Sequence, residues 1–171
     1  MYIHNGFAGK GGRAAMTMAM KAGTVTAMDC GGHLHEFYDF SINSGTGMNM
    51  ICLQMIRPGF NVSGVEPSEN EIENLIDKSL DDGALDMKLL GGHYPMTTEA
   101  IQRVVEVAYK KKAYVAFHVG TTKNGVGNFN SFKDAIEISE GLSMDLVHVN
   151  SYYKTDTRRP YCRDFGGAVH T

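Results

Sequence analysis

The chain has 171 residues, of which 43% are apolar and 20% are charged, and its formal net charge is −3. These values are typical of one globular domain, which at this length buries ~70% of the surface that its unfolded chain exposes. They argue against a basic nucleic-acid-binding protein, and no apolar run approaches the ~18 residues of a membrane-spanning helix. We therefore expect a single domain over residues 1–171 that acts on a small molecule, with neither nucleic acid nor membrane as a partner.

The cysteines predict a reducing compartment. Cys30, Cys52 and Cys162 are odd in number, widely spaced and never arranged as CxxC. Such cysteines are typical of reduced thiols, and the N-terminus has no signal-peptide pattern. We expect a cytoplasmic protein.

The first half of the chain has a less regular pattern than the second. Small residues and methionines over residues 12–22 favour a helix, and residues 24–29 and 49–56 have the composition of strands. Between these strands, the polar and aromatic stretch from Gly31 to Gly47 is predicted to be a long loop. Long loops with little structure of their own are often functional.

The second half alternates between helix and strand patterns. Ser68 and Glu71 form a capping-box sequence at the start of an amphipathic helix over residues 68–82. Threonine at 97 or 98 caps the next helix, a glycine-rich loop spans residues 120–128, and a further helix runs from Ser131 to Gly141. The predicted strands of this half are residues 84–90, 113–118 and 143–149.

Strands that alternate with helices indicate a parallel sheet, either doubly wound or closed as a (β/α) barrel. No GxGxxG follows the first strand and there is no Walker A sequence. The glycine-rich segment 6–12 follows no convincing strand, so a phosphate-binding loop is not favoured there. We expect an α/β fold of the TIM-barrel type that is incomplete, with about six of the eight strands.

Three polar residues stand near the ends of three successive predicted strands. Lys88, His118 and His148 are spaced thirty residues apart, which is one strand-and-helix unit each time. They should therefore lie side by side at the C-terminal rim of the sheet, where (β/α) barrels have their active sites. A lysine in a buried strand is costly unless its charge is removed or paired. Carboxylation by CO2 would make it an anionic oxygen ligand, and the two histidines would supply imidazole ligands.

The sequence resembles the amidohydrolase superfamily, in its cyclic-amidohydrolase, deacylase and adenine-deaminase-like branches. The resemblance rests on MKLLGGHYP at residues 87–95, AFHVGTT at 116–122, LVHVNSY at 146–152 and AGTVTAMD at 22–29. It covers most of the chain, from about residue 4 to about residue 160. It implies that Lys88, His118 and His148 are metal ligands on the fourth, fifth and sixth strands of the barrel.

The resemblance also implies a His-x-His pair on the first strand. The best match is Tyr2-Ile3-His4, so His4 would be the fourth metal ligand, while Tyr2 stands where the family has its other histidine. His33-Leu34-His35 is a rival match, because alternate residues of a strand face one way. In either case we expect His33, His35 and Glu36 to line the mouth of the site.

The implied activity is metal-dependent hydrolysis of a C–N bond in an amide, cyclic amide or amidine. One or two divalent ions, with zinc the expected metal, would activate the attacking water. The residues expected to contact substrate follow the fourth and sixth strands: His93, Tyr94, Asn150 and Tyr152. The family's general base is an aspartate at the end of the eighth strand. The sequence offers no candidate for it, since Asp164 comes too soon after the sixth strand.

A second hypothesis belongs to a different class of protein. The chain would be a catalytically inactive barrel fragment that acts as an interaction or structural module, which Tyr2 and the absent aspartate favour. Six strands would leave two open sheet edges, which proteins rarely tolerate. Under either hypothesis we expect a homo-oligomer or a complementing segment as partner.

Overall fold

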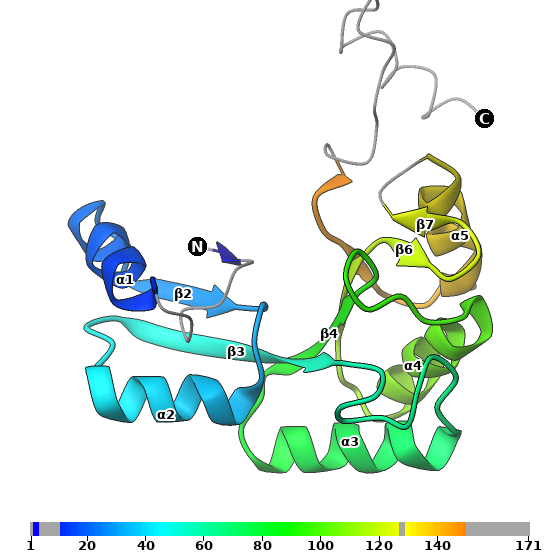
Figure 1. Cartoon of the computed structure of the whole chain (residues 1–171), viewed down its shortest axis with the longest axis horizontal. Coiled ribbons are helices and arrows are strands. Elements are labelled where there is room, and N and C mark those ends of the chain that lie inside the picture. Colours follow the sequence, from blue (N-terminus) through cyan, green and yellow to red (C-terminus); the bar gives the residue numbers. More distant parts are fainter. Residues whose placement is uncertain (1, 4–10, 127–128, 150–171) are drawn as a thin grey trace, which may run out of the picture.

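The computed structural model describes residues 2–3, 11–126 and 129–149 (Figure 1). His4, Asn150, Tyr152 and Cys162 lie outside these residues. Six of the described strands form one sheet in which every neighbouring pair is parallel. The strands of this sheet are β1 (Tyr2–Ile3), β2 (Thr26–Asp29), β3 (Asn49–Ile56), β4 (Asp86–Leu90), β5 (Val115–His118) and β8 (Asp145–Leu146).

The strands lie in the sheet in the order in which they occur in the chain. The order is β1-β2-β3-β4-β5-β8. The five strands predicted at 24–29, 49–56, 84–90, 113–118 and 143–149 are therefore parallel neighbours in chain order, as their alternation with helices indicates. A doubly wound sheet would reverse direction at a switch point, and the described strands show no reversal. Because parallel crossovers are almost always right-handed, a sheet built in one direction carries its helices on one face.

The helices do cover one face of the sheet, and the buried side chains show which. Met16 of α1 packs with Ala27, and Leu34 and Phe37 of α2 pack with Cys52. No described helix is both long and apolar enough to cross a membrane. The helices are α1 (Gly12–Lys21), α2 (Leu34–Ser44), α3 (Glu69–Asp81), α4 (Thr98–Lys110) and α5 (Phe129–Ser139).

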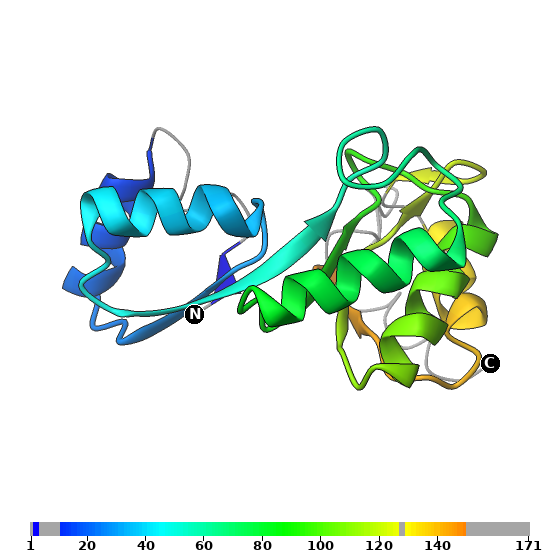
Figure 2. The same ribbon diagram turned by 90° about the horizontal axis from the view of Figure 1, so that it is seen from below.

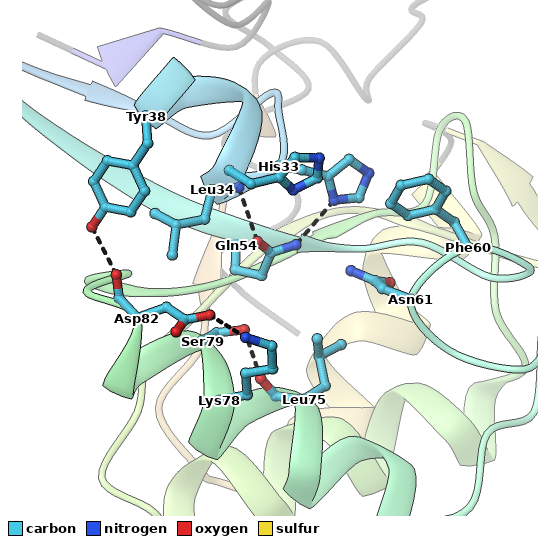
Figure 3. A pocket seen from close by; sticks show the side chains of 11 residues that line it. His33, Leu34, Tyr38, Gln54, Phe60, Asn61, Leu75, Lys78, Ser79 and Asp82 are labelled. Atoms are coloured by element: carbon cyan, nitrogen blue, oxygen red, sulfur yellow. Dashed lines mark hydrogen bonds and ion pairs between the residues drawn. The ribbon is translucent and has the colours of Figure 1, made fainter. Parts of the chain in front are cut away.

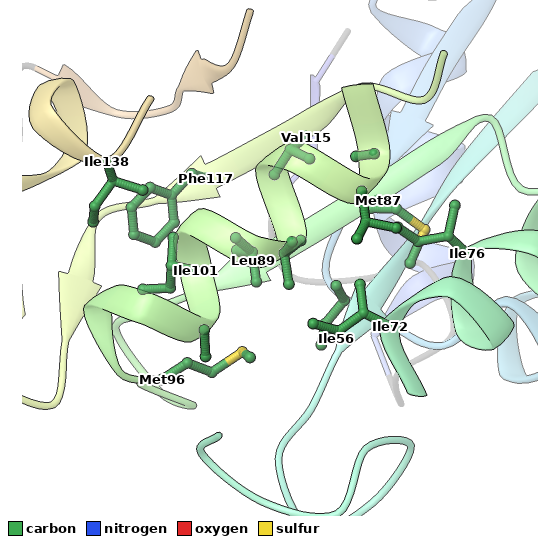
Figure 4. Packing of buried hydrophobic residues seen from close by; sticks show 14 of the residues in the cluster. Ile56, Ile72, Ile76, Met87, Leu89, Met96, Ile101, Val115, Phe117 and Ile138 are labelled. Atoms are coloured by element: carbon green, nitrogen blue, oxygen red, sulfur yellow. The ribbon is translucent and has the colours of Figure 1, made fainter. Parts of the chain in front are cut away.

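The largest hydrophobic core lies between the sheet and α3, α4 and α5 (Figure 4). Ile56, Leu89, Phe117 and Leu146 are successive cross-strand partners, so all four side chains face this core. A buried side chain of this size contributes roughly 1.5–3 kcal/mol relative to an exposed one. Alternation along each strand therefore assigns the intervening residues to the opposite face of the sheet.

That opposite face carries a smaller cluster of side chains. Cys30, Leu53, Ala116 and Val147 are buried together there. Lys88 lies on this face, because it alternates with Met87 and Leu89, which both face the helices.

Strand β3 joins two groups of elements. Its first half, Asn49–Cys52, pairs with β2, and its second half, Leu53–Ile56, pairs with β4. Consequently β1, β2, α1 and α2 lie at one end of β3, and β4, β5, β8 and α3 to α5 lie at the other (Figures 1 and 2). The two groups share strand β3. The segment of β3 that pairs with β4 begins four residues after the segment that pairs with β2.

Helix capping explains where α3 and α4 begin. The Ser68 hydroxyl accepts a hydrogen bond from the Glu71 amide, and the Glu71 carboxylate accepts one from the Ser68 amide. Thr97 caps α4 by accepting a hydrogen bond from the Ala100 amide at 3.2 Å. Both starts agree with the capping patterns in the sequence.

The prediction of a long loop from Gly31 to Gly47 is wrong, because residues 34–44 form helix α2. Leu34 and Phe37 are spaced by three residues and are buried against the sheet, and Phe40 also packs inward. The aromatic residues thus follow a helical period that the surrounding polar residues obscure. The rival His-x-His pairing at residues 33–35 is wrong too, since these residues start a helix and form no strand.

Two smaller predictions also change. The glycine-rich segment after β5 contains a short antiparallel hairpin, β6 (Gly120–Thr121) with β7 (Gly125–Val126), inside the predicted loop. The strand expected over residues 143–149 is reduced to Asp145–Leu146. His148 therefore lies two residues beyond its strand.

The ends of β4 and β5 approach each other at Gly91, which predicts the effect of a substitution there. A Cβ atom on Gly91 would lie 2.7 Å from both the Gly120 nitrogen and the His118 carbonyl oxygen. Gly91→Ala should therefore lower the free energy of unfolding by ~1–3 kcal/mol in urea denaturation. Gly64→Ala is the control, since no atom lies within 4 Å of its added Cβ. Equal stability of the two variants would contradict this close approach.

Candidate functional site

Lys88 is among the largest fully buried side chains of the structure described, with an exposed fraction of 0%. It stands in the middle of β4, on the face of the sheet opposite the helices. Its cross-strand partners are Met55 on β3 and Ala116 on β5, and Ala116 pairs in turn with Asp145 on β8. A single row across four strands thus brings one amine and one carboxylate to the same face.

Burial changes the acid–base behaviour of this lysine. The pKa of Lys88 falls from its ordinary value of 10.5 to about 8, chiefly because burial penalises the ammonium form. Electrostatic interaction with Cys30 and with Asp145 raises the pKa of Lys88, but it does not cancel the effect of burial. Lys88 therefore has a neutral amine available at a pH far below that of an ordinary lysine.

His118 and His148 come together beside this lysine. Their ring centroids are 5.3 Å apart in an edge-to-face arrangement. Burial lowers the pKa of His148, and the nearby charge of Lys88 lowers it further, while Asp145 opposes the change. The three residues predicted from their thirty-residue spacing are thus neighbours in space.

His148 is held in an unusual backbone conformation. Its φ of 60° lies in the left-handed region, which residues other than glycine seldom adopt. The amide of the preceding Val147 donates to the Phe117 carbonyl at 3.1 Å, which fixes the segment against β5. Left-handed residues persist where the surrounding structure holds them, and they are common at functional sites.

The other predicted site residues are placed differently. Tyr94 is half-buried, and its ring lies 4.7 Å from the guanidinium carbon of Arg57, in the loop after β3. His93 is exposed. Both backbone amides donate to the Leu90 carbonyl at the end of β4, and the role of these two residues toward a substrate stays a prediction.

The histidines after β2 are arranged around a cavity. His33 is 2% exposed and precedes the first residue of α2, and its ring is stacked on that of His35 at 5.8 Å between centroids. A cavity of about 460 Å³ opens between α2 and α3 (Figure 3). Its lining includes both histidines but not Glu36, and it lies on the helix side of the sheet, so the expectation that these three residues line the mouth of the Lys88 site stays a prediction.

Sequence reasoning missed Asp145 and Cys30. Both act on the charge of Lys88. Asp145 alternates with Leu146, whose side chain faces the helix core, so the period of two in the predicted strand could have placed the carboxylate beside Lys88. Cys30 follows β2, and nothing in its local sequence indicates that it approaches β4.

The residues present fit a metal ion only if Lys88 becomes a ligand. Within the described ranges, no group of three or more histidine, cysteine, aspartate and glutamate side chains could hold one. His118 and His148 supply two imidazoles, and a carboxylated Lys88 would add anionic oxygen atoms on the same face. The fit thus depends on a chemical change at the buried amine.

Comparison with known proteins adds no further assignment. No family model matches this sequence, and no curated protein matches it.

The lowered pKa of Lys88 predicts a stability that depends on pH. Between pH 8 and 10.5 the unfolded chain binds more protons at this residue than the folded chain, so stability should rise with pH across that window. Lys88→Met removes the buried charge and should raise the free energy of unfolding at pH 7 by about 3 kcal/mol. The gain should shrink towards pH 10.5.

This prediction is checked by urea denaturation at pH 7 and pH 10, in buffer with a chelator and without CO2. Lys123→Met is the control, since Lys123 is an exposed lysine. A Lys88→Met variant that is less stable than the wild type at pH 7 would show that Asp145 and Cys30 stabilise the ammonium more than burial penalises it.

Proposed function

We propose that this chain is part of a metal-dependent hydrolase that acts on a C–N bond in an amide, cyclic amide or amidine. The observation that carries the proposal is a fully buried lysine on β4, on the face of the sheet that also bears His118 and His148. A lysine buried at 0% exposure is rare in a structural role, because its charge must be paired or lost.

The proposal includes a barrel of the TIM type. The sequential strand order and the helices on a single face support it, because a sheet of this kind curls until its other face becomes an interior. Lys88 and Ala116 would then belong to the interior of the barrel. His118, at the last residue of β5, would stand at the C-terminal rim, where such barrels have their active sites.

Lys88 can lose its charge by reacting with CO2. The neutral amine nitrogen forms a bond to the carbon, one C=O electron pair moves onto oxygen, and the nitrogen releases its proton to water. The product is a carbamate whose single negative charge is shared by two oxygen atoms. The low pKa of Lys88 favours this reaction, because only the neutral amine is a nucleophile.

Lys88 as a carbamate, His118, His148 and, by the family resemblance, His4 would hold one or two divalent ions, with zinc the expected metal. When bound, the metal supplies Lewis-acid polarisation of the scissile carbonyl and of the attacking water. The chain's own residues prepare the site. Burial keeps the His148 imidazole neutral and so able to bind a cation, and Asp145 balances the Lys88 ammonium until CO2 reacts. The general base stays unassigned.

The expected compartment and partners belong to the same proposal. We expect a cytoplasmic hydrolase with a small-molecule substrate that associates with a second copy or a complementing segment. The strands at the two edges of the described sheet, β1 and β8, support this, since each has two residues and a neighbour on only one side. Unpaired edges offer N–H and C=O groups to another chain. They also favour the alternative of an inactive interaction module.

Zinc binding separates the hydrolase from the inactive module. The wild type should retain about one or two equivalents of zinc after dialysis and should hydrolyse N-acyl amino acids or cyclic imides only very slowly as this isolated chain, because no general base is assigned. Lys88→Ala, His118→Ala and His148→Ala should each weaken zinc binding by at least ~100-fold, more than the loss of a residue that only orients a ligand. Lys123→Ala should bind zinc as the wild type does. A wild type that binds no zinc would support the module.

Carboxylation of Lys88 is tested directly. In the zinc-loaded protein, native mass spectrometry should find the added mass of one CO2, and carbon-13 labelled bicarbonate should give a carbamate signal that Lys88→Ala lacks. An unmodified Lys88 in a zinc-loaded wild type would contradict the proposed ligand.

A further inference from the structure

The cavity between α2 and α3 lies apart from the face that bears Lys88. Its walls come from the start of α2, from Gln54 on the helix-facing side of β3, from the loop after β3 and from the last turns of α3 (Figure 3). At about 460 Å³ its volume is in the range of small-molecule sites. The residues that matter to the argument are His33, Gln54, Phe60 and Lys78, together with Arg57, which does not line the cavity but contacts Phe60.

The protonation state of His33 follows from its neighbour Gln54. The Gln54 side-chain oxygen accepts a hydrogen bond from the Leu34 amide at 3.0 Å, which fixes the orientation of the Gln54 amide. The Gln54 side-chain nitrogen therefore faces His33 Nδ1, 3.0 Å away, and donates to it. Because an amide nitrogen only donates, Nδ1 must be the accepting atom, and the proton of the neutral ring is on Nε2.

That proton has no described acceptor. His33 Nε2 is buried, and no hydrogen-bond partner for it exists among the described residues. A buried N–H group without an acceptor is unfavourable, and such groups in native structures usually have a ligand or water to bind. Burial, the largest cause, lowers the pKa of His33, and so do His35 and Arg57, whereas Glu36 raises it.

Arg57 is a second hydrogen-bond donor near Phe60, and it carries a positive charge. In the described ranges no carboxylate and no hydrogen-bond acceptor contacts its guanidinium group. The guanidinium instead lies between two rings, 5.2 Å from the centroid of Phe60 and 4.7 Å from that of Tyr94. Its backbone is fixed, since its amide donates to the Asn61 side chain at 2.7 Å. A guanidinium fixed in this way can bind a carboxylate through charge-assisted hydrogen bonds.

Phe60 connects the two donors. Its ring is 4.4 Å from the ring of His33 and also contacts Arg57, so both donors lie around one aromatic side chain. Phe60 is nevertheless 56% exposed and has room for an apolar group on its surface. Lys78, the other cation of the cavity, is already paired with Asp82 (Figure 3).

We propose that this cavity binds a small organic acid, whose carboxylate accepts hydrogen bonds from His33 Nε2 and the Arg57 guanidinium and whose apolar group packs on Phe60. Glu36, the nearby carboxylate, lies on the first turn of α2 and is exposed, so water screens its repulsion of the acid. The proposal does not involve Lys88, and it holds whether or not the chain is a hydrolase.

The test uses benzoate and its neutral analogue benzamide, which have nearly the same shape. Both are titrated into the full chain in the presence of a chelator, and binding is followed by NMR. Benzoate should bind and should shift the His33 Nε2–H resonance, and benzamide should bind at least ~10-fold more weakly. Arg57→Gln should weaken benzoate binding by at least ~10-fold, and Phe60→Ala should weaken it less.

Two matched variants control for loss of charge. Lys78→Gln removes the paired cation of the same cavity, and Lys88→Ala removes the buried lysine of the other face; both should bind benzoate as the wild type does. The wild-type resonance of His33 keeps the test valid if a His33 variant fails to fold. The proposal is overturned by equal affinity for benzoate and benzamide, by no binding of either, or by loss of binding in Lys78→Gln or Lys88→Ala.

Discussion

The burial of one amine constrains the rest of this structure. Lys88 lies at a position where a strand of a closed sheet would carry an apolar residue. The effects that act on its charge follow from that buried position. Burial lowers its pKa to about 8, Asp145 and Cys30 resist the change, and its charge acts in turn on His148. The small residue Ala116 beside it on β5 leaves room for a long side chain on this face. A buried lysine is costly unless its charge is paired or removed, and this cost is the reason for the proposal that the amine reacts with CO2.

Much of the architecture could be predicted from the sequence because its signals are local. The capping sequences at Ser68 and Thr97 are followed by helices, and the apolar run at 49–56 is the strand β3. The thirty-residue repeat then brings Lys88, His118 and His148 together, because each repeat is one strand-and-helix unit. The prediction failed for the segment from Gly31 to Gly47, where three inward-facing residues at helical spacing are surrounded by histidine, aspartate and glycine. Packing against β3 determines that helix, and the local sequence does not reveal the packing.

The parts of both sites that escaped prediction are contacts between residues far apart in the chain. Cys30 acts on Lys88 across β3, and His33 meets Phe60 through the turn after β3. The tautomer of His33 depends on Gln54, a residue that is unremarkable in the sequence and decisive in the fold because its amide is fixed by Leu34. These contacts depend on how the segment before α2 and the loop after β3 pack against β3. The sequence identified the residues with distinctive chemistry, and the structure shows which of them share an environment.

The change of pairing partner along β3 affects how the protein unfolds. One half of this strand completes its hydrogen-bond ladder with β2 and the other half with β4, with no residue of β3 paired to both. This change of partner between Cys52 and Leu53 is a place where two units of unfolding can meet, and the bonds from the Leu85 amide to the Cys52 carbonyl and from the Tyr38 hydroxyl to the Asp82 carbonyl connect the two sides. The β4 side has the larger core, so its amide protons should exchange with solvent last. Opening of β2 and α2 while β4 and β5 remain paired would take the His33 cavity apart, because His33 and Leu34 belong to one unit and Lys78 and Ser79 to the other.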